Sequence, residues 1–145
     1  MTSSEIVYGR RRPVNPRVAN IVIDCADLDV MAAFWGGLLG METSGRVDDW
    51  LDLGPLGDRG PVLSFQLVPE RKAVKNRLHL DLDVPDIHAA GERAERLGAT
   101  PASGPLGRPH APFRVWRDPE GNEFCFCTDP APDPGGSGGD RSLGR

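Results

Sequence analysis

Cysteine and long apolar runs are both scarce in this 145-residue chain. The three cysteines, Cys25, Cys125 and Cys127, are an odd number and follow no secretion signal, so we expect reduced thiols rather than a disulfide framework. The first 16 residues lack the apolar core of a signal peptide. No apolar run approaches the roughly 18 residues that span a membrane. The sequence therefore predicts a cytoplasmic protein that has no membrane partner.

Positive charge is also limited. The formal net charge is -4 and the isoelectric point is about 5.3, whereas nucleic-acid-binding domains usually present a basic face. We therefore expect no nucleic-acid partner. Residues 129–145 are dominated by Pro, Gly and Ser, and residues 1–16 show no periodic apolar pattern. This composition predicts two disordered tails around one folded domain, residues 17–128.

The folded part contains one pattern twice. Residues 18–45 match residues 77–104 at four pairs of positions, each pair 59 positions apart: Asn20 with His79, Asp24 with Asp83, Asp27 with Asp86, and Gly45 with Gly104. Each copy has the pattern of a strand, a helix and three further strands. The sequence predicts an α+β domain of two βαβββ modules, at about 17–70 and 76–128. Together the modules should form a curved mixed sheet shaped as a cup.

Local signals mark both helices. Asp27 and Asp86 each precede apolar residues that recur at three- and four-residue spacing, and Asp in this position accepts backbone N–H bonds from the first helical turn. Gly40 and Gly98 follow the apolar stripes, where a left-handed residue commonly ends a helix. We therefore expect one helix between each Asp and the Gly that follows it.

Period-two alternation separates two faces of the predicted sheet. One face is apolar and suits the floor beneath the helices. The other is largely polar although it lies on central strands, and it either faces water or lines a concave small-molecule site. The candidate ligand-binding residues are the polar-face residues together with Trp116: Asn20, Trp50, Ser64, Gln66, His79, Asp81, Trp116 and Cys125.

His79 is the candidate catalytic residue, because imidazole titrates near neutral pH. Asp81 lies two residues along the same strand, about 7 Å away by Cα at ~3.3 Å per residue. That spacing favours electrostatic influence over a direct hydrogen bond. His79 and Cys125 are also candidates for a nucleophile pair, although a small buried cysteine is the commoner role.

Three segments carry a family resemblance. DLDVMAAFWGGLLGM, residues 27–41, resembles the opening helix of glyoxalase/bleomycin-resistance/extradiol-dioxygenase proteins. LSFQLVPE…KNRLHLDLDVPDI and RDPEGNEFCF resemble an actinobacterial glyoxalase-like subgroup. By these motifs, nearly all of residues 17–128 is similar to the vicinal-oxygen-chelate (VOC) superfamily. The resemblance implies a small-molecule ligand and a homodimer.

The resemblance also bears on a metal cofactor. Metal-dependent relatives hold a divalent ion with four strand residues, typically His, Glu, His and Glu. The matching positions here are Asn20, Gln66, His79 and Cys125. Of these, His79 and the carbonyl oxygen of Gln66 are the metal candidates, and none of the four is a carboxylate. The resemblance therefore implies a degenerate metal site, and no cofactor is firmly expected.

Two functions stay open at this stage. An ionisable polar cup favours an enzyme of lyase or isomerase type in which His79 is the central group. The loss of the metal carboxylates favours a non-catalytic protein that sequesters a small molecule, as bleomycin-resistance proteins do.

Overall fold

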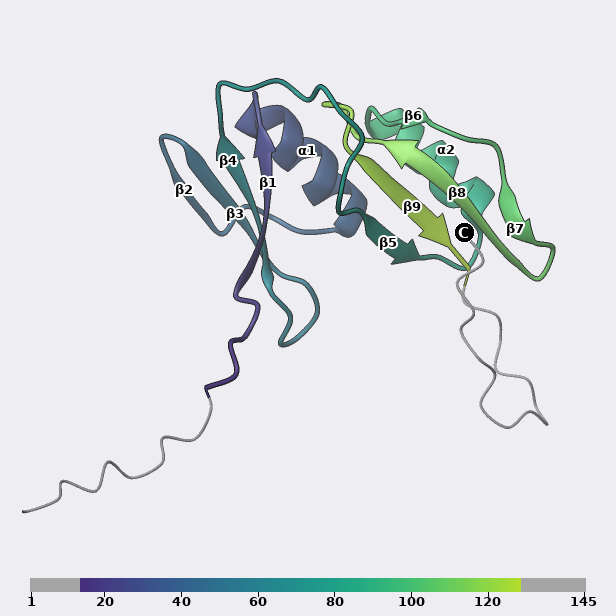
Figure 1. The fold of residues 1–145 in the computed structure, drawn as a ribbon, viewed down its shortest axis with the longest axis horizontal. Coiled ribbons are helices and arrows are strands. Elements are labelled where there is room, and N and C mark those ends of the chain that lie inside the picture. Colours follow the sequence, from purple (N-terminus) through teal and green to yellow (C-terminus); the bar gives the residue numbers. More distant parts are fainter. Residues whose placement is uncertain (1–13, 129–145) are drawn as a thin grey trace, which may run out of the picture.

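The computed structural model describes residues 14–128, so the predicted tail at 129–145 and residues 1–13 lie outside the described residues. Figure 1 shows two sheets side by side, with both helices on their far side. The elements of the described part are β1 (Asn20–Cys25), α1 (Leu28–Leu39), β2 (Gly45–Val47), β3 (Trp50–Pro55), β4 (Val62–Leu67), β5 (Leu80–Asp83), α2 (Ile87–Leu97), β6 (Thr100–Pro101), β7 (Leu106–Arg108), β8 (Ala111–Arg117) and β9 (Glu123–Cys127). Neither helix has the length and hydropathy of a membrane span.

The strands form two separate mixed sheets, and not the single curved sheet expected from the sequence. The first has the order β1-β4-β3-β2, and the second has the order β5-β9-β8-β6, with β7 also paired to β8. The pairs β1–β4 and β5–β9 are parallel, and the other strand pairs are antiparallel. The expected βαβββ order is present in the first half, and the second half adds β7. The shared strand order agrees with two similar modules, but the internal repeat stays a prediction.

Both helices begin and end as the local signals predict. Asp27 and Asp86 each accept two backbone N–H bonds from the first turn of the helix that follows. Gly40 and Gly98 end the helices with φ of 67° and 115°, which are left-handed values that suit glycine.

The core lies between the helices and the apolar faces of the two sheets. The rings of Phe34 and Trp35, on α1, contact the ring of Phe124 on β9, with centroids 5.9 Å and 5.1 Å apart. The predicted apolar floor is confirmed along the strand centres, but Leu67, at the end of β4, and Leu78, before β5, are 42% and 69% exposed. The buried floor residues are Leu51, Leu53, Leu63, Phe65, Phe124 and Phe126.

The turn between β8 and β9 joins the second module to the first. Asp118 is only 3% exposed, and its Oδ2 accepts the indole N–H of Trp35 at 3.1 Å. Its Oδ1 accepts backbone N–H groups of the turn itself. Two residues further on, the carboxylate of Glu120 accepts the backbone N–H groups of Ala26 and Asp27 at 2.7 and 3.0 Å. The turn is therefore tied to both the helix and the β1–α1 corner of the first module.

A second link connects the two helices. The guanidinium of Arg93, on α2, donates to the carbonyl oxygens of Gly37 and Leu38 at 2.5 and 2.8 Å. These carbonyls belong to the last turn of α1, where helical carbonyls lack partners within the helix. Arg93 therefore caps α1 from the other module.

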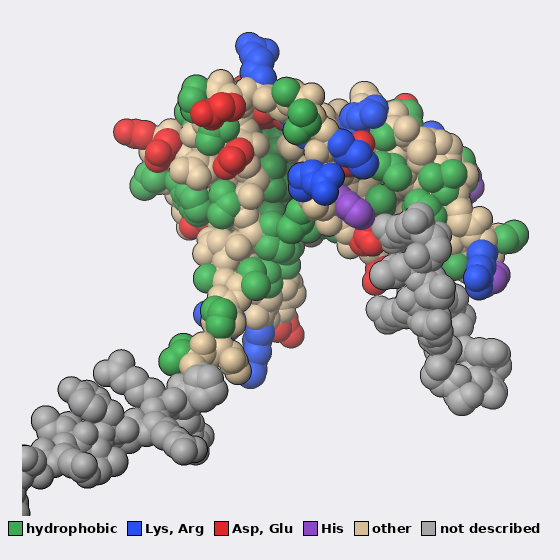
Figure 2. All heavy atoms as spheres, viewed as in Figure 1, with side chains coloured by type: hydrophobic (Ala, Val, Ile, Leu, Met, Phe, Trp, Pro, Cys, Tyr) green, Lys and Arg blue, Asp and Glu red, His purple; other side chains and the backbone are tan. Residues whose placement is uncertain are grey.

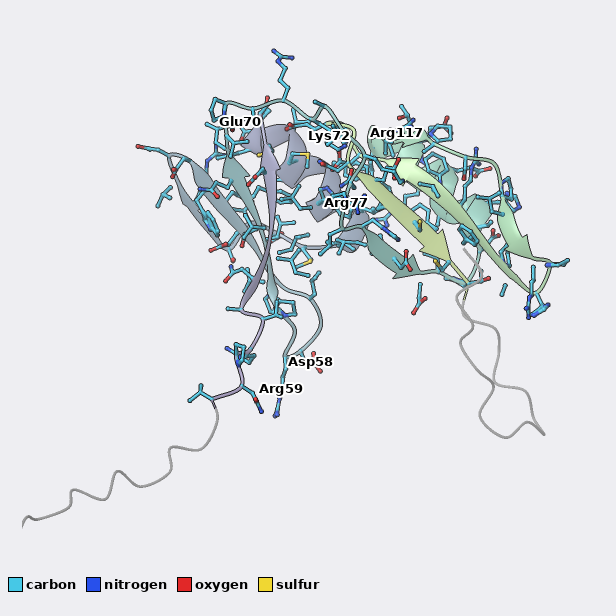
Figure 3. The ribbon with its side chains drawn as sticks, in the orientation of Figure 1. Asp58, Arg59, Glu70, Lys72, Arg77 and Arg117 are labelled. Carbon is cyan, nitrogen blue, oxygen red and sulfur yellow. The ribbon has the colours of Figure 1, made fainter. Side chains whose placement is uncertain are left out.

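Asp118→Ala should destabilise the fold by about 3 kcal/mol, because it leaves the buried indole N–H of Trp35 and several turn N–H groups without an acceptor. Urea denaturation of wild type and variant measures the difference. Asp58→Ala is the matched control, since Asp58 is exposed in the β3–β4 loop (Figure 3) and should change stability by less than about 0.5 kcal/mol. Equal effects of the two substitutions would show that the Asp118 bonds do not hold the modules together.

Candidate functional site

The polar residues predicted from the sequence fall into two groups, one on each sheet. We call the side of each sheet opposite α1 and α2 its open face. Asn20, Trp50, Ser64 and Gln66 lie on the open face of the first sheet, since strand register places them in adjacent rows. On the second sheet, the register of β5 with β9 places Asp81 beside Cys125, and the side chain of His79 reaches the same place.

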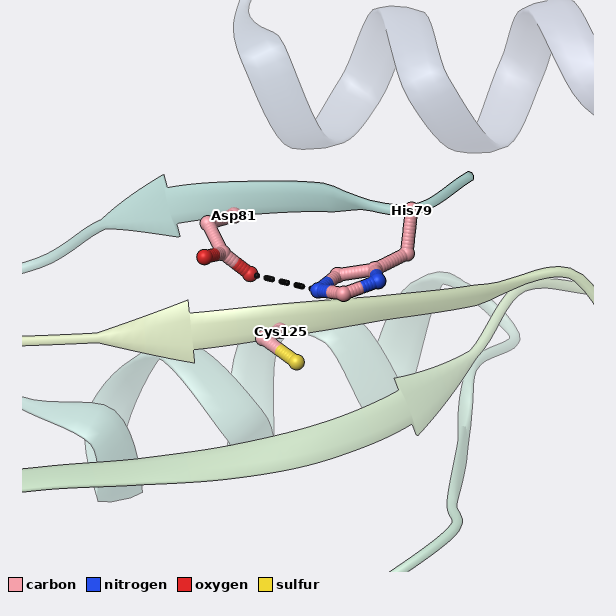
Figure 4. A group of neighbouring side chains, drawn as sticks. All are labelled: His79, Asp81 and Cys125. Atoms are coloured by element: carbon pink, nitrogen blue, oxygen red, sulfur yellow. Dashed lines mark ion pairs between the residues drawn. The ribbon is translucent and has the colours of Figure 1, made fainter. Parts of the chain in front are cut away.

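His79, Asp81 and Cys125 form a compact group that we call the His79 cluster (Figure 4). The Nε2 of His79 lies 3.2 Å from Oδ1 of Asp81. Their side chains are 45% and 41% exposed, whereas Cys125 is buried. The sequence favoured electrostatic influence over a direct hydrogen bond for this pair, and the 3.2 Å approach corrects that preference. Cα spacing does not fix the separation of side-chain tips, and these two side chains point toward each other.

The His79 cluster offers donors for one divalent ion. One nitrogen, one carboxylate oxygen and one sulfur lie within 4.8 Å of one another, and this mixed set suits zinc-like ions. Two of the four family positions, His79 and Cys125, belong to this set, whereas Asn20 donates to Ser64 on the first sheet. Asp81 supplies the carboxylate that those four positions lack. The residues therefore fit a three-ligand site of His79, Asp81 and Cys125, whereas the metal candidates from the sequence were His79 and Gln66.

A cleft of about 440 Å³ separates the two sheets beneath the segment that links β4 to β5. Its walls include residues 21–25 along β1 and residues 78–80 leading into β5. Among the described strands, β1 and β5 each pair on one side only, so the cleft runs along two unpaired strand edges. His79 lines the cleft, which gives its imidazole access to a volume typical of small-molecule sites.

Basic side chains gather near the cleft, and Arg71 and Lys72 line it. Figure 2 shows Lys and Arg beside a His between the two lobes, and Figure 3 shows Lys72, Arg77 and Arg117 in this region. The ammonium of Lys75 bonds the carboxylate of Glu123. This bond lowers the pKa of Glu123, and the charges of Arg117 and Lys72 lower it further. Glu123 is therefore held ionised within an ion-pair network.

Cys25 also lines the cleft, on the edge strand β1. Burial, with a smaller effect from the Glu120 carboxylate, raises the pKa of its thiol to about 11. Because the thiolate is the reactive form of cysteine, this raised pKa disfavours Cys25 as a nucleophile at neutral pH.

On the first sheet, four side chains form a continuous hydrogen-bond chain that we call the Trp50 network. Asn20 Nδ2 donates to Ser64 Oγ at 2.9 Å, and Ser64 Oγ donates to Asp52 Oδ1 at 2.5 Å. The indole N–H of Trp50 donates to the same Asp52 oxygen at 2.7 Å. Ser64 is fully buried, whereas Trp50 and Asp52 are half-buried. The chain fixes the orientation of the Trp50 ring on the open face.

Sequence reasoning missed Asp52 as a site residue. Alternation along β3 does place it on the same face as Trp50, and this was the available signal. Its importance depends on hydrogen bonds across strands to Ser64, which no single-strand pattern reveals.

The structure removes Trp116 from the predicted ligand-binding set. It is 1% exposed, and its register partner is Phe124 of the core, so it lies on the helix-covered face. A Cβ on Gly91 of α2 would approach the Trp116 ring to 2.5 Å. The glycine therefore makes room for the ring, and Trp116 belongs to the core and not to the open face.

A family of glyoxalase-like domains matches residues 20–127, which is most of the chain. The chain belongs to the glyoxalase-like domain family. No curated protein sequence matches this glyoxalase-like chain.

Solved structures share its fold. A glyoxalase-related enzyme from Fulvimarina pelagi has a TM-score of 0.65 and 21% identity, over 79% of this chain and 88% of that one. A glyoxalase/bleomycin resistance protein/dioxygenase family enzyme from Burkholderia phytofirmans PsJN has a TM-score of 0.64 and 21% identity, over 78% and 98%. The fosfomycin resistance protein FosX from Mesorhizobium loti has a TM-score of 0.62 and 16% identity, over 81% and 94%. Together with the family match, they confirm the VOC superfamily, and the actinobacterial subgroup stays a prediction.

The metal-binding capacity of the His79 cluster can be tested directly. After equilibrium dialysis against Zn²⁺, wild-type protein should retain about one ion per chain, since three suitable donors converge. Cys125→Ser should retain markedly less, because it removes the sulfur donor. Cys127→Ser is the matched control, since Cys127 lies two residues along the same face of β9, and it should retain as much zinc as wild type. Equal retention by Cys125→Ser would refute the site.

Proposed function

We propose that this glyoxalase-like chain is an enzyme that moves a proton on a small organic molecule, in a reaction of isomerase or lyase type. The observation that carries the proposal is the His79–Asp81 pair, whose imidazole lines a cleft of ligand size. Fold alone does not support a reaction, and the chemistry of this pair does.

The pair has the features of a general acid–base group. When Nε2–H of His79 donates to Asp81, the lone pair for proton abstraction lies on Nδ1. Abstraction makes an imidazolium, and the Asp81 carboxylate 3.2 Å away stabilises that positive charge. The same proton can then return to another carbon or to a leaving group, so that the reaction is neutral overall. Asp81 thus acts as the positioning residue and His79 as the catalytic one.

Ligand sequestration without a reaction is the second candidate. The Trp50 network favours it, because a half-buried indole with a fixed orientation is a ready stacking surface. If the protein only sequesters its ligand, the His79→Ala variant should bind the ligand with wild-type affinity. The Trp50→Ala variant should lose binding. We also propose a homodimer, as the family resemblance implies, which light scattering after gel filtration would test.

Proton transfer can be followed without knowledge of the natural substrate. In D₂O, wild-type protein should catalyse deuterium incorporation at the α-carbon of some members of a panel of α-hydroxyketones and α-hydroxyaldehydes, monitored by NMR. His79→Gln should lower the rate about 100- to 10,000-fold, the usual contribution of a general base. Asp81→Asn should cause a smaller loss.

Two controls accompany this experiment. His88→Gln, on α2, and Asp83→Asn, two residues beyond Asp81 on β5, should both exchange at the wild-type rate. If His79→Gln exchanges as fast as wild type, His79 is not the base. If wild-type protein labels no member of the panel, sequestration becomes the better proposal.

The same assay separates proton transfer from metal chemistry. Chelator should leave the exchange rate unchanged, and Zn²⁺ should lower it, because an ion at the His79 cluster would take the imidazole nitrogen that faces Asp81. Exchange that is lost with chelator and restored by a divalent ion would contradict the acid–base proposal and assign the cluster to a metal centre.

A further inference from the structure

The open face of the first sheet carries acidic groups and an aromatic ring. The charged residues of β1 to β4 are Asp24, Arg46 and Asp52. Arg46 alternates to the opposite side, where it bonds Asp29 of α1. Asp24 and Asp52 are therefore the charged residues that these strands present on the open face. Figure 2 shows acidic and apolar side chains over this lobe, while the basic side chains gather at the cleft.

One oxygen of Asp52 is directed to a place where the sheet has no side chain. Oδ1 holds the indole of Trp50 and the hydroxyl of Ser64. Oδ2 faces Gly45, the register partner of Asp52 on β2, where an added Cβ would lie 3.7 Å from that oxygen. Gly45 therefore leaves space for a ligand group beside a carboxylate oxygen.

The Trp50 ring is bonded to the other oxygen of the same carboxylate and is held in place. Its N–H is bonded to Asp52, so the ring cannot turn without breaking a charge-assisted bond. Indole has the most favourable aromatic face for a cation. A fixed indole on one oxygen of the carboxylate and an open position beside the other oxygen form a corner whose chemistry selects positive charge.

We propose that the corner formed by Gly45, Trp50 and Asp52 binds a small organic cation, such as a quaternary ammonium, pyridinium or guanidinium group. The cation lies over the indole with its charge toward Oδ2 of Asp52. This binding site is on the first sheet, and it goes beyond the reaction proposed for His79. Its occupancy does not depend on whether His79 is catalytic.

Tryptophan fluorescence reports on this corner selectively. Trp35 and Trp116 are each 1% exposed. Of the three tryptophans, Trp50 is therefore the one that a quencher dissolved in water can reach. N-methylpyridinium chloride, a planar cation that quenches indole, should quench saturably because it binds. Benzenesulfonate, a planar anion of similar size, should produce no saturable change. Isothermal titration calorimetry gives the affinity of each probe independently of fluorescence.

Two substitutions test the corner in different ways. Asp52→Asn keeps the shape and removes the charge, and it should weaken N-methylpyridinium binding about tenfold. Gly45→Val keeps the charge and fills the gap, and it should weaken binding at least as much. The backbone of Gly45 is not left-handed, so valine is tolerated there, and thermal unfolding checks that both variants fold.

The outcomes decide the proposal. Saturable binding of the cation, loss in both variants and unchanged binding in His79→Gln would support it. Linear collisional quenching with no calorimetric signal would overturn it, as would equal binding of benzenesulfonate or wild-type affinity in both variants. Because His79→Gln is read in the same titration, failure here is distinguishable from failure of the proton-transfer proposal.

Discussion

The carboxylate of Asp118 ties the second module to α1 of the first, and the described strands of the two sheets share no backbone ladder. Burying the Trp35 ring in the first module requires a partner for its N–H, and that partner comes from a turn of the second module. The same turn places Glu120 on the β1–α1 corner, and Arg93 links the helices behind the sheets. All of these contacts lie away from the open faces. They fix the separation of β1 and β5, so the cleft stays open and His79 has access to it.

Much of this arrangement is predictable because its causes are local. Asp27 and Gly40 mark the ends of α1 through hydrogen bonds and backbone angles set within a few residues. Alternation identifies which strand residues form the core floor, since each strand presents its side chains to two sides in turn. Those signals also place Asn20 and His79 on open faces, where the structure has them.

The features that sequence did not predict depend on contacts between distant residues. The split into two sheets depends on which strand edges pair, and no strand pattern encodes it. The 3.2 Å approach of His79 to Asp81 depends on side-chain rotamers. Trp116 is instructive, because Arg114, on the same side of β8, gives no apolar pattern. Its place in the core depends on its register with Phe124 of β9 and on the space left by Gly91 of α2, which no single-strand pattern contains.

The two modules place different chemistry at corresponding positions. Asn20 corresponds to His79, and the same sequence interval separates Gln66 from Cys125. The first sheet therefore has amides, which stay neutral and act through hydrogen bonds, where the second has an imidazole and a thiol, which can change protonation state. Asp52 in the first sheet is engaged by two donors, whereas Asp81 in the second faces an ionisable partner. A molecule that bridges both sheets would meet one face suited to holding it and another suited to reacting with it. For such a molecule, the separation of the two sheets would set the distance between the group that is held and the group that reacts.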